Sequence, residues 1–480
     1  MSLFSFFKCK NFSFRKCKGV INDKNENYQK RKAHFRQFIS ILGGYILMID
    51  VGSQISWTSS ALPYLVSDNS EIPITFYQSA WLASIDSICT IFGIIIYPLI
   101  MNIVGRKYTI LIFGIIQLIA WISINFANNF TYLCITRMIV GIGIGGTVNF
   151  FTIYIGEIAE KNIRGMFLSI DKICLNFGGF ILNIVGTFLS YKTMNLVMII
   201  IPIIGLLTFP LMHETPYFYL LKNQEDNAVR ILMKLNGKNF EINENIERMK
   251  KTINECRESQ KNVLHELFTD KGSRRGFIIK IIIDFIYAFS GFLVIQTYAQ
   301  DIFVLSESSL KPAYSVMLIS GVQSLIGFSS CYLVDHWGRK PTFLLSGILS
   351  SICLLLIGIF FFFKYYLKID VTSFSLTPLI SLIIFQIVSN IGLSTLPYIY
   401  SGELFSVKVK GLAIMISSIF LGLCIFMSKF MTPFLGKAAG IYSVFWLFSS
   451  VCFIGPFIII FIVPETKGKN LEEILEILRS

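Results

Sequence analysis

Three short charged motifs occur twice along this chain, in the same order, and each one follows a long apolar stretch. The three pairs are Gly105-Arg106-Lys107 with Gly338-Arg339-Lys340, Glu157 and Arg164-Gly165 with Glu403 and Lys410-Gly411, and Glu214-Thr215-Pro216 with Pro464-Glu465-Thr466-Lys467-Gly468. The first pair is offset by 233 residues (338 minus 105) and the second by 246 (403 minus 157). Each motif follows the second, fourth or sixth apolar segment of its half. A duplicated unit of six apolar segments indicates a membrane protein in which one half rocks against the other around a central site. Neither a soluble enzyme nor a single-repeat receptor gives this pattern.

The composition supports a membrane protein. Hydrophobic residues make up 54% of the 480 residues and charged residues 15%, and the mean hydropathy is +0.65. An apolar run of about 20 residues crosses a hydrocarbon core about 30 Å thick as one helix. Twelve such runs lie near residues 37–57, 79–102, 107–127, 131–155, 166–189, 193–212, 276–300, 314–334, 341–363, 377–401, 411–433 and 441–463. We therefore expect an all-α membrane fold with twelve transmembrane helices in two six-helix bundles.

The placement of basic residues predicts the topology. The net charge is +13, but Lys and Arg gather in the tail before the first helix and after the even-numbered helices. This alternation follows the positive-inside rule and places both termini and the central loop in the cytoplasm, so it argues against nucleic acid as a partner. The predicted regions are a basic tail (1–36), a first bundle (37–216), a cytoplasmic helical loop (217–275), a second bundle (276–463) and a C-terminal tail (464–480).

The sequence shows no pattern for a cofactor or a metal. The ten cysteines include no CxxC pair, and they have no metal-ligand spacing with the four histidines. No Gly-rich phosphate loop follows a strand, so ATP-driven transport has no support. We expect no cofactor, no metal and no enzymatic activity. The expected partners are a small-molecule substrate and the lipid bilayer, with no obligate protein partner and with the plasma membrane as the expected location.

Several motifs in order resemble a known family. They are Pro464-Glu465-Thr466-Lys467-Gly468-Lys469-Asn470-Leu471-Glu472-Glu473-Ile474, the series Arg137, Gly141, Gly145, Gly146, Tyr154, Glu157, Arg164 and Gly165, the pair Trp57-Thr58-Ser59 and Leu62-Pro63, and the spacing of Gly291, Tyr298, Ile302 and Phe303. On these residues the chain resembles the sugar porter family of the major facilitator superfamily, most like its insect facilitated trehalose transporters. The resemblance runs from the first apolar segment to Ile474.

The resemblance implies a carrier of trehalose, a hexose or a related polyol that works by alternating access. Proton-coupled members carry an acidic residue in the first helix, at the position where Thr58 stands here. Asp50 lies about two turns away, roughly 11 Å along a helix axis. We therefore expect facilitative uniport. Two alternatives remain open: a transporter-like sugar sensor without turnover, and a porter of a non-sugar solute.

The repeated charged motifs have a physical use in such a carrier. Its cytoplasmic helix ends must hold together and then release, and Arg–carboxylate pairs are geometrically specific while partly solvated pairs contribute little net energy. The resemblance assigns this gate to Arg106, Glu157, Arg164, Glu214, Arg339, Glu403 and Glu465. The alternative is that these residues only anchor helix ends at the lipid interface. Four residues depart from the family pattern: Asn102, His213 and Tyr217 in the first half and Lys410 in the second. These departures predict a looser gate in the first half.

The positions that hold a hexose in the family differ more. Amides satisfy sugar hydroxyls as donors and acceptors, but the expected amides fall here on Lys172, Tyr287, Ala288 and Leu293, and two expected tryptophans on Tyr398 and Gly422. Gln323 keeps an amide, and Asn390 stands at an acidic position. The candidate substrate-binding residues are Lys172, Gln323, Tyr398, Asn390 and Gln296. We expect poor glucose transport. Gly422 either enlarges the cavity for a disaccharide or leaves a space that a neighbouring side chain fills.

Lys172 is unusual because a lysine inside a membrane helix costs about 2.5–3.5 kcal/mol on insertion scales. Such a residue faces a cavity or a partner. Its possible partners within apolar segments are Asp50, Asp86, Asp171 and Asp284. Two interpretations remain: a pair with one of these carboxylates that only fixes helix packing, or a position in the cavity that alters selectivity.

Overall fold

The computed structural model describes residues 14–236, 242–259, 263–308, 310–463, 465 and 471–479. Residues 1–13 of the predicted basic tail, and Pro464 and 466–470 of the last charged motif, lie outside the described residues. Every regular element in the described part of the chain is helical. The expected all-α fold is therefore confirmed for these residues.

The first half contains six membrane spans. Its elements are α1 (Phe14–Val66), α2 (Phe76–Val104), α3 (Arg106–Asn125), α4 (Phe130–Ile158), α5 (Lys161–Phe188) and a sixth span made of α6 (Tyr191–Met198), α7 (Ile200–Leu207) and the 3-10 turn η1 (Phe209–Leu211). Helix α1 is longer than the predicted span, because it extends into the predicted basic tail. A capping box opens α2: Thr75 accepts from the backbone N–H of Gln78, whose side chain accepts from the N–H of Thr75.

The second half repeats this arrangement. Its elements are α12 (Lys271–Ala288), α13 (Phe292–Ser306), α14 (Pro312–Trp337), α15 (Arg339–Phe361), the short turns η2 (Phe362–Tyr366) and η3 (Thr372–Phe374), α16 (Thr377–Ile391), α17 (Leu396–Glu403), α18 (Val407–Ala439), α19 (Ile441–Ile462) and α20 (Leu471–Arg479). The seventh and tenth spans are thus each broken into two helices, α12–α13 and α16–α17. Eleven described segments are long and apolar enough to span a membrane, and the 26-residue α14 completes the expected twelve.

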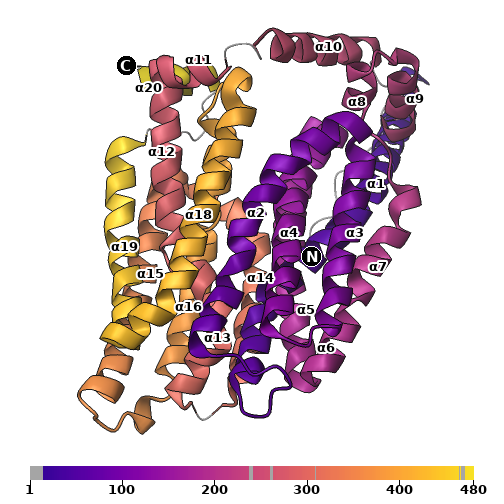
Figure 1. Cartoon of the computed structure of the whole chain (residues 1–480). Helices are drawn as coiled ribbons and strands as arrows, with labels where there is room; N and C mark the ends of the chain where they lie inside the picture. Colours follow the sequence, from indigo (N-terminus) through magenta and orange to yellow (C-terminus); the bar gives the residue numbers. More distant parts are fainter. Residues whose placement is uncertain are drawn as a thin grey trace, which may run out of the picture.

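Between the halves lies a helical insert. It consists of α8 (Pro216–Leu221), α9 (Glu225–Asn236), α10 (Ile242–Ser259) and α11 (Val263–Thr269). Leu220, Ala228, Leu232, Ile246 and Ile253 form a small apolar core among α8, α9 and α10. The insert and α20 lie at the same end of the molecule (Figure 1). We call this the insert end.

The two halves stand side by side and meet along two seams. Helix α2 of the first half lies beside α18 of the second half (Figure 1), and α5 packs against α14. Helix α13 also packs against α1. The helices of both seams come from segments far apart in the sequence, so the central space of the molecule is bounded by both halves.

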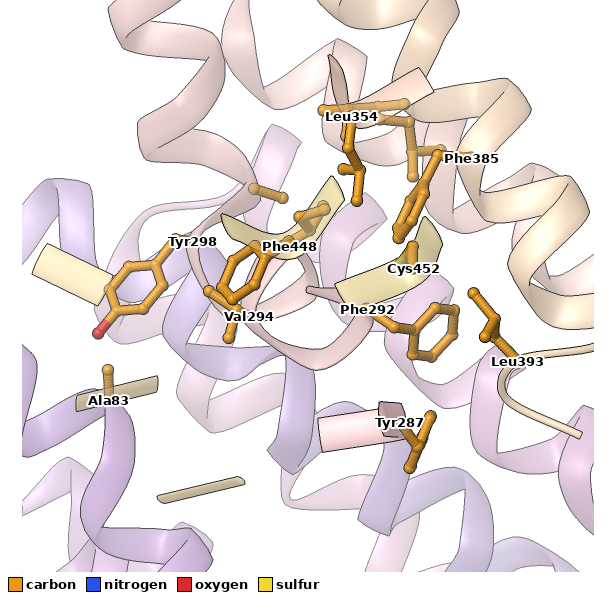
Figure 2. Close-up of a cluster of buried hydrophobic side chains, with 14 of the residues drawn as sticks. Ala83, Tyr287, Phe292, Val294, Tyr298, Leu354, Phe385, Leu393, Phe448 and Cys452 are labelled. Atoms are coloured by element: carbon orange, nitrogen blue, oxygen red, sulfur yellow. The ribbon is translucent and has the colours of Figure 1, made fainter. Parts of the chain in front are cut away.

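The break in the seventh span depends on Gly291. This residue has φ +82°, which L side chains rarely adopt, and it ends the irregular stretch between α12 and α13. A Cβ placed on it would lie 2.7 Å from Cδ2 of Phe448. Figure 2 shows Phe448 with Phe292 and Cys452 in a buried apolar cluster that includes residues of both halves. Cys452 donates from Sγ to the carbonyl oxygen of Ser290, 3.4 Å away, at the break.

We expect Gly291→Ala to destabilise the protein. The left-handed conformation costs a non-glycine residue roughly 1–2 kcal/mol, and the new methyl group also displaces the ring of Phe448. The melting temperature in detergent, followed by fluorescence, should fall by several degrees.

The matched control is Gly436→Ala inside α18, where an added Cβ meets its nearest atom at an ordinary 3.7 Å. Its melting temperature should stay near that of the parent. Equal melting temperatures for both variants would show that the break does not require glycine.

Candidate functional site

At the insert end of the first half, three elements meet at one buried arginine. Nε and Nη2 of Arg106 each donate to a carboxylate oxygen of Glu157 at 2.9 Å. The backbone N–H groups of Arg106 and Lys107 donate to the two oxygens of Glu214, at 2.9 and 3.0 Å. A carboxylate at the N-terminus of α3 also interacts favourably with the helix dipole. These bonds join the start of α3 to the ends of α4 and of the sixth span.

The second half repeats the arrangement with its own residues. Nη2 of Arg339 donates to Oε1 of Glu403 at 2.9 Å. The backbone N–H groups of Arg339 and Lys340 both donate to Glu465 at 3.1 Å. The sequence repeat therefore corresponds to a repeated structure, in which each Arg–carboxylate pair joins helices of one half. The role of these seven residues as a gate stays a prediction.

Arg164 and Lys410 stand at equivalent positions and make similar local contacts. Nη2 of Arg164 donates to the carbonyl oxygen of Ala159 at 3.3 Å, and Nε of Arg164 is buried without a hydrogen-bond partner. Nζ of Lys410 donates to the carbonyl oxygen of Gly402 at 2.8 Å. Both side chains thus bond the preceding helix of their own half, so the replacement of arginine by Lys410 keeps the local contact.

His213 and Glu214 follow the sixth span and have shifted pKa values. Burial raises the pKa of Glu214, although the N–H groups that it accepts favour its charged form. Burial, with Lys234 and Lys107 nearby, lowers the pKa of His213. Nδ1 of His213 lies 2.9 Å from Oγ of Ser40 on α1. This contact joins His213, which departs from the family pattern, to α1 of the first half.

Four glycines at the insert end have open space beside them. Gly156 and Gly165 of the first half, and Gly402 and Gly411 of the second, are two pairs related by the offset of 246 (402 minus 156 and 411 minus 165). A Cβ added to any of these four residues meets no heavy atom within 4 Å. The helix surfaces at these glycines are therefore free of packing.

The opposite end is closed along both seams. The ring of Trp81 on α2 lies edge-on to that of Phe430 on α18, with centroids 4.9 Å apart. The ring centroids of Tyr77 on α2 and Phe434 on α18 are 5.6 Å apart. On the other seam the ring centroids of Phe188 on α5 and Tyr314 on α14 lie 6.3 Å apart. The structure thus shows a two-half bundle closed at the end opposite the insert.

Lys172 reaches across the centre of the molecule. Its Nζ lies 3.3 Å from Oγ of Ser394 and also bonds Oγ1 of Thr395, both in the break between α16 and α17. Three of its four suggested carboxylate partners are held by other groups. Asp50 accepts from Trp121 at 2.7 Å and Gln54 at 2.9 Å, Asp86 binds Arg137, and Asp284 binds Lys280.

Gln323 and Gln296 also bridge the halves. Nε2 of Gln323 on α14 donates to Oδ1 of Asn176 on α5 at 3.3 Å. Nε2 of Gln296 on α13 donates to Oγ of Ser56 on α1 at 3.4 Å. Three of the five predicted substrate-binding residues therefore lie between the halves, and their role in binding a substrate stays a prediction. Asn176 and Ser56 belong with them and were not predicted.

Asn390 and Tyr398 belong to the broken tenth span. Asn390 is fully buried, and its Nδ2 donates to the carbonyl oxygen of Gln386 at 3.0 Å. Its carbonyl oxygen accepts from Thr395, which also bonds Lys172. Asn390 is therefore linked to Lys172 through Thr395. Tyr398 is 57% exposed, and its ring lies edge-on to that of Tyr287 at 6.4 Å.

Gly422 lies at a helix seam. A Cβ on it would stand 3.2 Å from Cγ1 of Ile91 and 3.5 Å from the carbonyl oxygen of Ser87, both on α2. The absence of a side chain lets α18 approach α2 closely. Of the two interpretations of this glycine, the structure favours the one in which neighbouring atoms occupy the space.

Two groups of buried charges were not predicted as partners. Arg137 of α4 donates to Oδ2 of Asp86 of α2 at 2.9 Å, and Nζ of Lys429 of α18 lies 3.5 Å from the same oxygen. Lys280 and Asp284 form a pair on α12. The spacing of four residues could have predicted the second pair. No sequence signal links Lys429 to Asp86, because they are 343 residues apart (429 minus 86).

Comparisons with known proteins agree with this architecture. Residues 25–478 match the family described as "Sugar (and other) transporter". The chain belongs to this family. It is 29% identical over 440 residues to the facilitated trehalose transporter Tret1 of Apis mellifera ligustica, covering 91% of this chain and 87% of the relative. It is 28% identical to the Tret1 protein of Bombyx mori, with 89% and 83% covered.

Solved structures show the same fold. The inward open xylose transporter XylE of E. coli matches with a TM-score of 0.75 at 19% identity, covering 92% of this chain and 98% of that chain. XylE bound to 6-bromo-6-deoxy-D-glucose, described as a major facilitator superfamily proton:xylose symporter, matches with a TM-score of 0.74 at 18% identity, covering 94% and 100%. The resemblance inferred from the motifs and the major facilitator fold are confirmed.

We expect Glu157→Gln to weaken the first half at the insert end. Glu157 is 14% exposed and accepts two charged hydrogen bonds from Arg106. Hydrogen bonds to charged groups contribute about 1.5–3 kcal/mol, so unfolding should require about 2 kcal/mol less. Thermal unfolding in nanodiscs would measure this loss.

Glu225→Gln is the control, since Glu225 pairs with Lys250 and both side chains are about half exposed. Exposed pairs contribute about 0–1 kcal/mol. If Glu157→Gln were no less stable than Glu225→Gln, the cluster around Arg106 would not hold the helix ends together.

Proposed function

We propose that this protein is a facilitative sugar carrier that works by alternating access, with trehalose as its substrate and hexoses or polyols as weaker ones. The observation that carries the proposal is the arrangement of the two halves. They are similar in structure, they meet through polar side chains at the centre, and they are closed at one end and free of packing at the other. A bundle of this kind exposes a central solute to one side of the membrane at a time.

The insert end faces the cytoplasm in this proposal. Lys and Arg gather in the basic tail, which includes the start of α1, and after the even-numbered spans, which end at the insert end, as the positive-inside rule requires. Both termini are then cytoplasmic, and the membrane is the plasma membrane. The closed end faces outward, so the structure corresponds to an inward-facing state.

Trehalose is favoured because the chain resembles proteins named facilitated trehalose transporters along about nine-tenths of its length. The centre supplies a cation and amides that can bind hydroxyl groups, from Lys172, Gln323, Asn176 and Gln296. The ring of Tyr398 is exposed enough to cover an apolar sugar face. Four polar groups from both halves can bind a ligand that spans the space between them, which suits a disaccharide.

Facilitative transport is favoured by the environment of the first helix. Thr58 stands where proton-coupled relatives carry an acid, and its side chain is buried. The carboxylate of Asp50 accepts hydrogen bonds from Trp121 and Gln54, so it is tied into the first half. A carboxylate held in this way is poorly placed to exchange protons with a central pathway.

The two charged clusters would act as the cytoplasmic gate by making each half rigid. Arg106 and Arg339 tie the helix ends of their own halves. When the cytoplasmic end closes, the unpacked surfaces at Gly165 and Gly411 would meet, and glycine allows helices to approach closely. The gate would then be a contact between two preassembled helix ends.

Uptake of labelled trehalose and glucose into oocytes tests this function. The wild type should equilibrate trehalose without accumulating it, protonophore should leave uptake unchanged, and glucose should enter poorly. Lys172→Gln and Gln323→Ala should each lower trehalose uptake about tenfold at low substrate concentration, because one lost hydrogen bond to a buried group costs about 1–3 kcal/mol and 1.4 kcal/mol corresponds to a factor of ten.

Lys192→Gln is the control at matched surface expression, since Lys192 is 66% exposed and pairs with Glu71 at the outer end. Its uptake should equal that of the wild type. Accumulation of sugar against its gradient that collapses with protonophore would contradict facilitation. Strong glucose uptake that neither Lys172→Gln nor Gln323→Ala changes would contradict the placement of the binding site.

A further inference from the structure

A buried cluster of three charges lies in the outer half of the bundle, and none of its members is among the central residues described above. Asp86 of α2 binds Arg137 of α4 at 2.9 Å, and Nζ of Lys429 of α18 lies 3.5 Å from the same oxygen, Oδ2. All three side chains are at most 5% exposed. Arg137 also donates to the carbonyl oxygen of Gln54 at 3.1 Å and lies 5.1 Å from the centre of the Trp57 ring.

The three charges are divided between the halves. Asp86 and Arg137 belong to the first half, where they form a balanced pair. Lys429 belongs to the second half and reaches across the seam between α18 and α2. The pairs of Arg106 with Glu157 and of Arg339 with Glu403, in contrast, each stay within one half. Separation of α2 from α18 therefore breaks the contact of Lys429 and leaves the pair of Arg137 intact.

The other seam carries no charge at the corresponding place. The repeat offsets of 233 and 246 relate Asp86 to Ile319 and Lys429 to Asn183 (86 plus 233, and 429 minus 246). Asn183 accepts a hydrogen bond from Ser60 of its own half at 3.2 Å. The charged contact is thus not a consequence of the duplication, since it is present on one seam alone of the two equivalent ones in the described structure.

The backbone of Lys429 is also linked to the broken seventh span. The hydroxyl of Tyr298 donates to the carbonyl oxygen of Lys429 at 3.2 Å. Tyr298 is the residue of α13 with non-helical φ and ψ, −110° and 18°. Two residues earlier, Gln296 bonds Ser56 of the first half. Lys429 therefore lies where α18, the kink of α13 and the first half meet.

We propose that Asp86 and Lys429 form an outer lock: an ion pair between the halves that holds the outer end closed in the inward-facing state and separates when that end opens. When the outer end opens, the ammonium group of Lys429 separates from the buried carboxylate of Asp86 and faces the opened outer pathway. A buried pair in low dielectric is strong once formed, and the equilibrium between two states shifts only through interactions that differ between them. The proposal rests on the alternating access described above, but not on the identity of the sugar.

The test measures how often the outer end opens. Ser56→Cys places a thiol at the contact between α1 and α13, which is buried in the closed state. In whole cells, a membrane-impermeant methanethiosulfonate reagent labels this thiol only when the outer end opens. Adding Lys429→Met should raise the labelling rate about fivefold or more, the lower end of typical coupling between sites. Lys429→Arg keeps the charge and should stay near the parent.

Lys429→Met is chosen because it leaves Asp86 and Arg137 as a balanced pair, whereas loss of Asp86 would leave two buried cations. Lys429→Gln, which removes the charge but keeps a polar side chain, is the second variant and should also label faster. Labelling of the wild-type protein, which lacks Ser56→Cys, measures the background from the native cysteines and is subtracted.

Lys280→Met is the matched control, since Lys280 is equally buried but pairs with Asp284 on its own helix. Its labelling rate should stay near the parent's. The proposal is overturned if both Lys429→Met and Lys429→Gln label at the parent's rate, or if Lys280→Met accelerates labelling as much as they do. Because labelling needs no transported sugar, failure of the sugar assignment and failure of the lock give different results.

Discussion

A hydrocarbon core can neither hydrogen-bond an exposed backbone nor solvate a charge, and the structure of this protein depends on that constraint. The described chain satisfies its backbone in helices. Three of its intramembrane cations receive a counter-charge, each in a different way. Lys280 is neutralised by Asp284 one turn along the same helix, and Arg137 by Asp86 within the first half. Lys429 receives its counter-charge from the other half, so its environment depends on how the halves are arranged.

The same constraint explains why the repeated motifs stand at helix ends. Arg106 and Arg339 each follow a glycine with positive φ, 96° and 94°, at which one span stops and the next begins. The freed N–H groups at the start of α3 and of α15 are accepted by Glu214 and Glu465. A charged cluster at this position satisfies the helix N-terminus and ties the half together. Each half is therefore tied together at this end by its own charged cluster.

The sequence was sufficient to predict the fold, because each span is a continuous apolar run and the charged motifs mark its ends. It was also sufficient to place Gln323 and Lys172 near the centre by counting from motif glycines. The sequence did not predict that the hydroxyl groups of Ser394 and Thr395 bond Lys172. These two residues lie in a helix break more than 200 residues away from Lys172 in the sequence. The partner of Lys429 was missed for the same reason. Packing between halves depends on a register that no local pattern reports.

Gly422 shows a further limit of the sequence. A missing side chain looks like additional cavity volume, but whether space is left depends on the neighbouring helix. Here α2 approaches closely enough that Ile91 and the backbone of Ser87 occupy the position. The substitution thus affects the seam between the halves.

The central claim is that the two ends of the bundle open in alternation. It is tested most directly by spin-label distances between the halves in lipid, measured with and without trehalose. One pair of labels, at Gly165 and Gly411, reports the cytoplasmic end, where both positions are free of packing. The other pair, at the exposed residues Asp68 and Lys311, reports the outer end. The account predicts that the population with a shorter cytoplasmic distance has a longer outer distance, and that trehalose changes the proportions of the two populations. Distances that stay fixed, or that lengthen together at both ends, would contradict it.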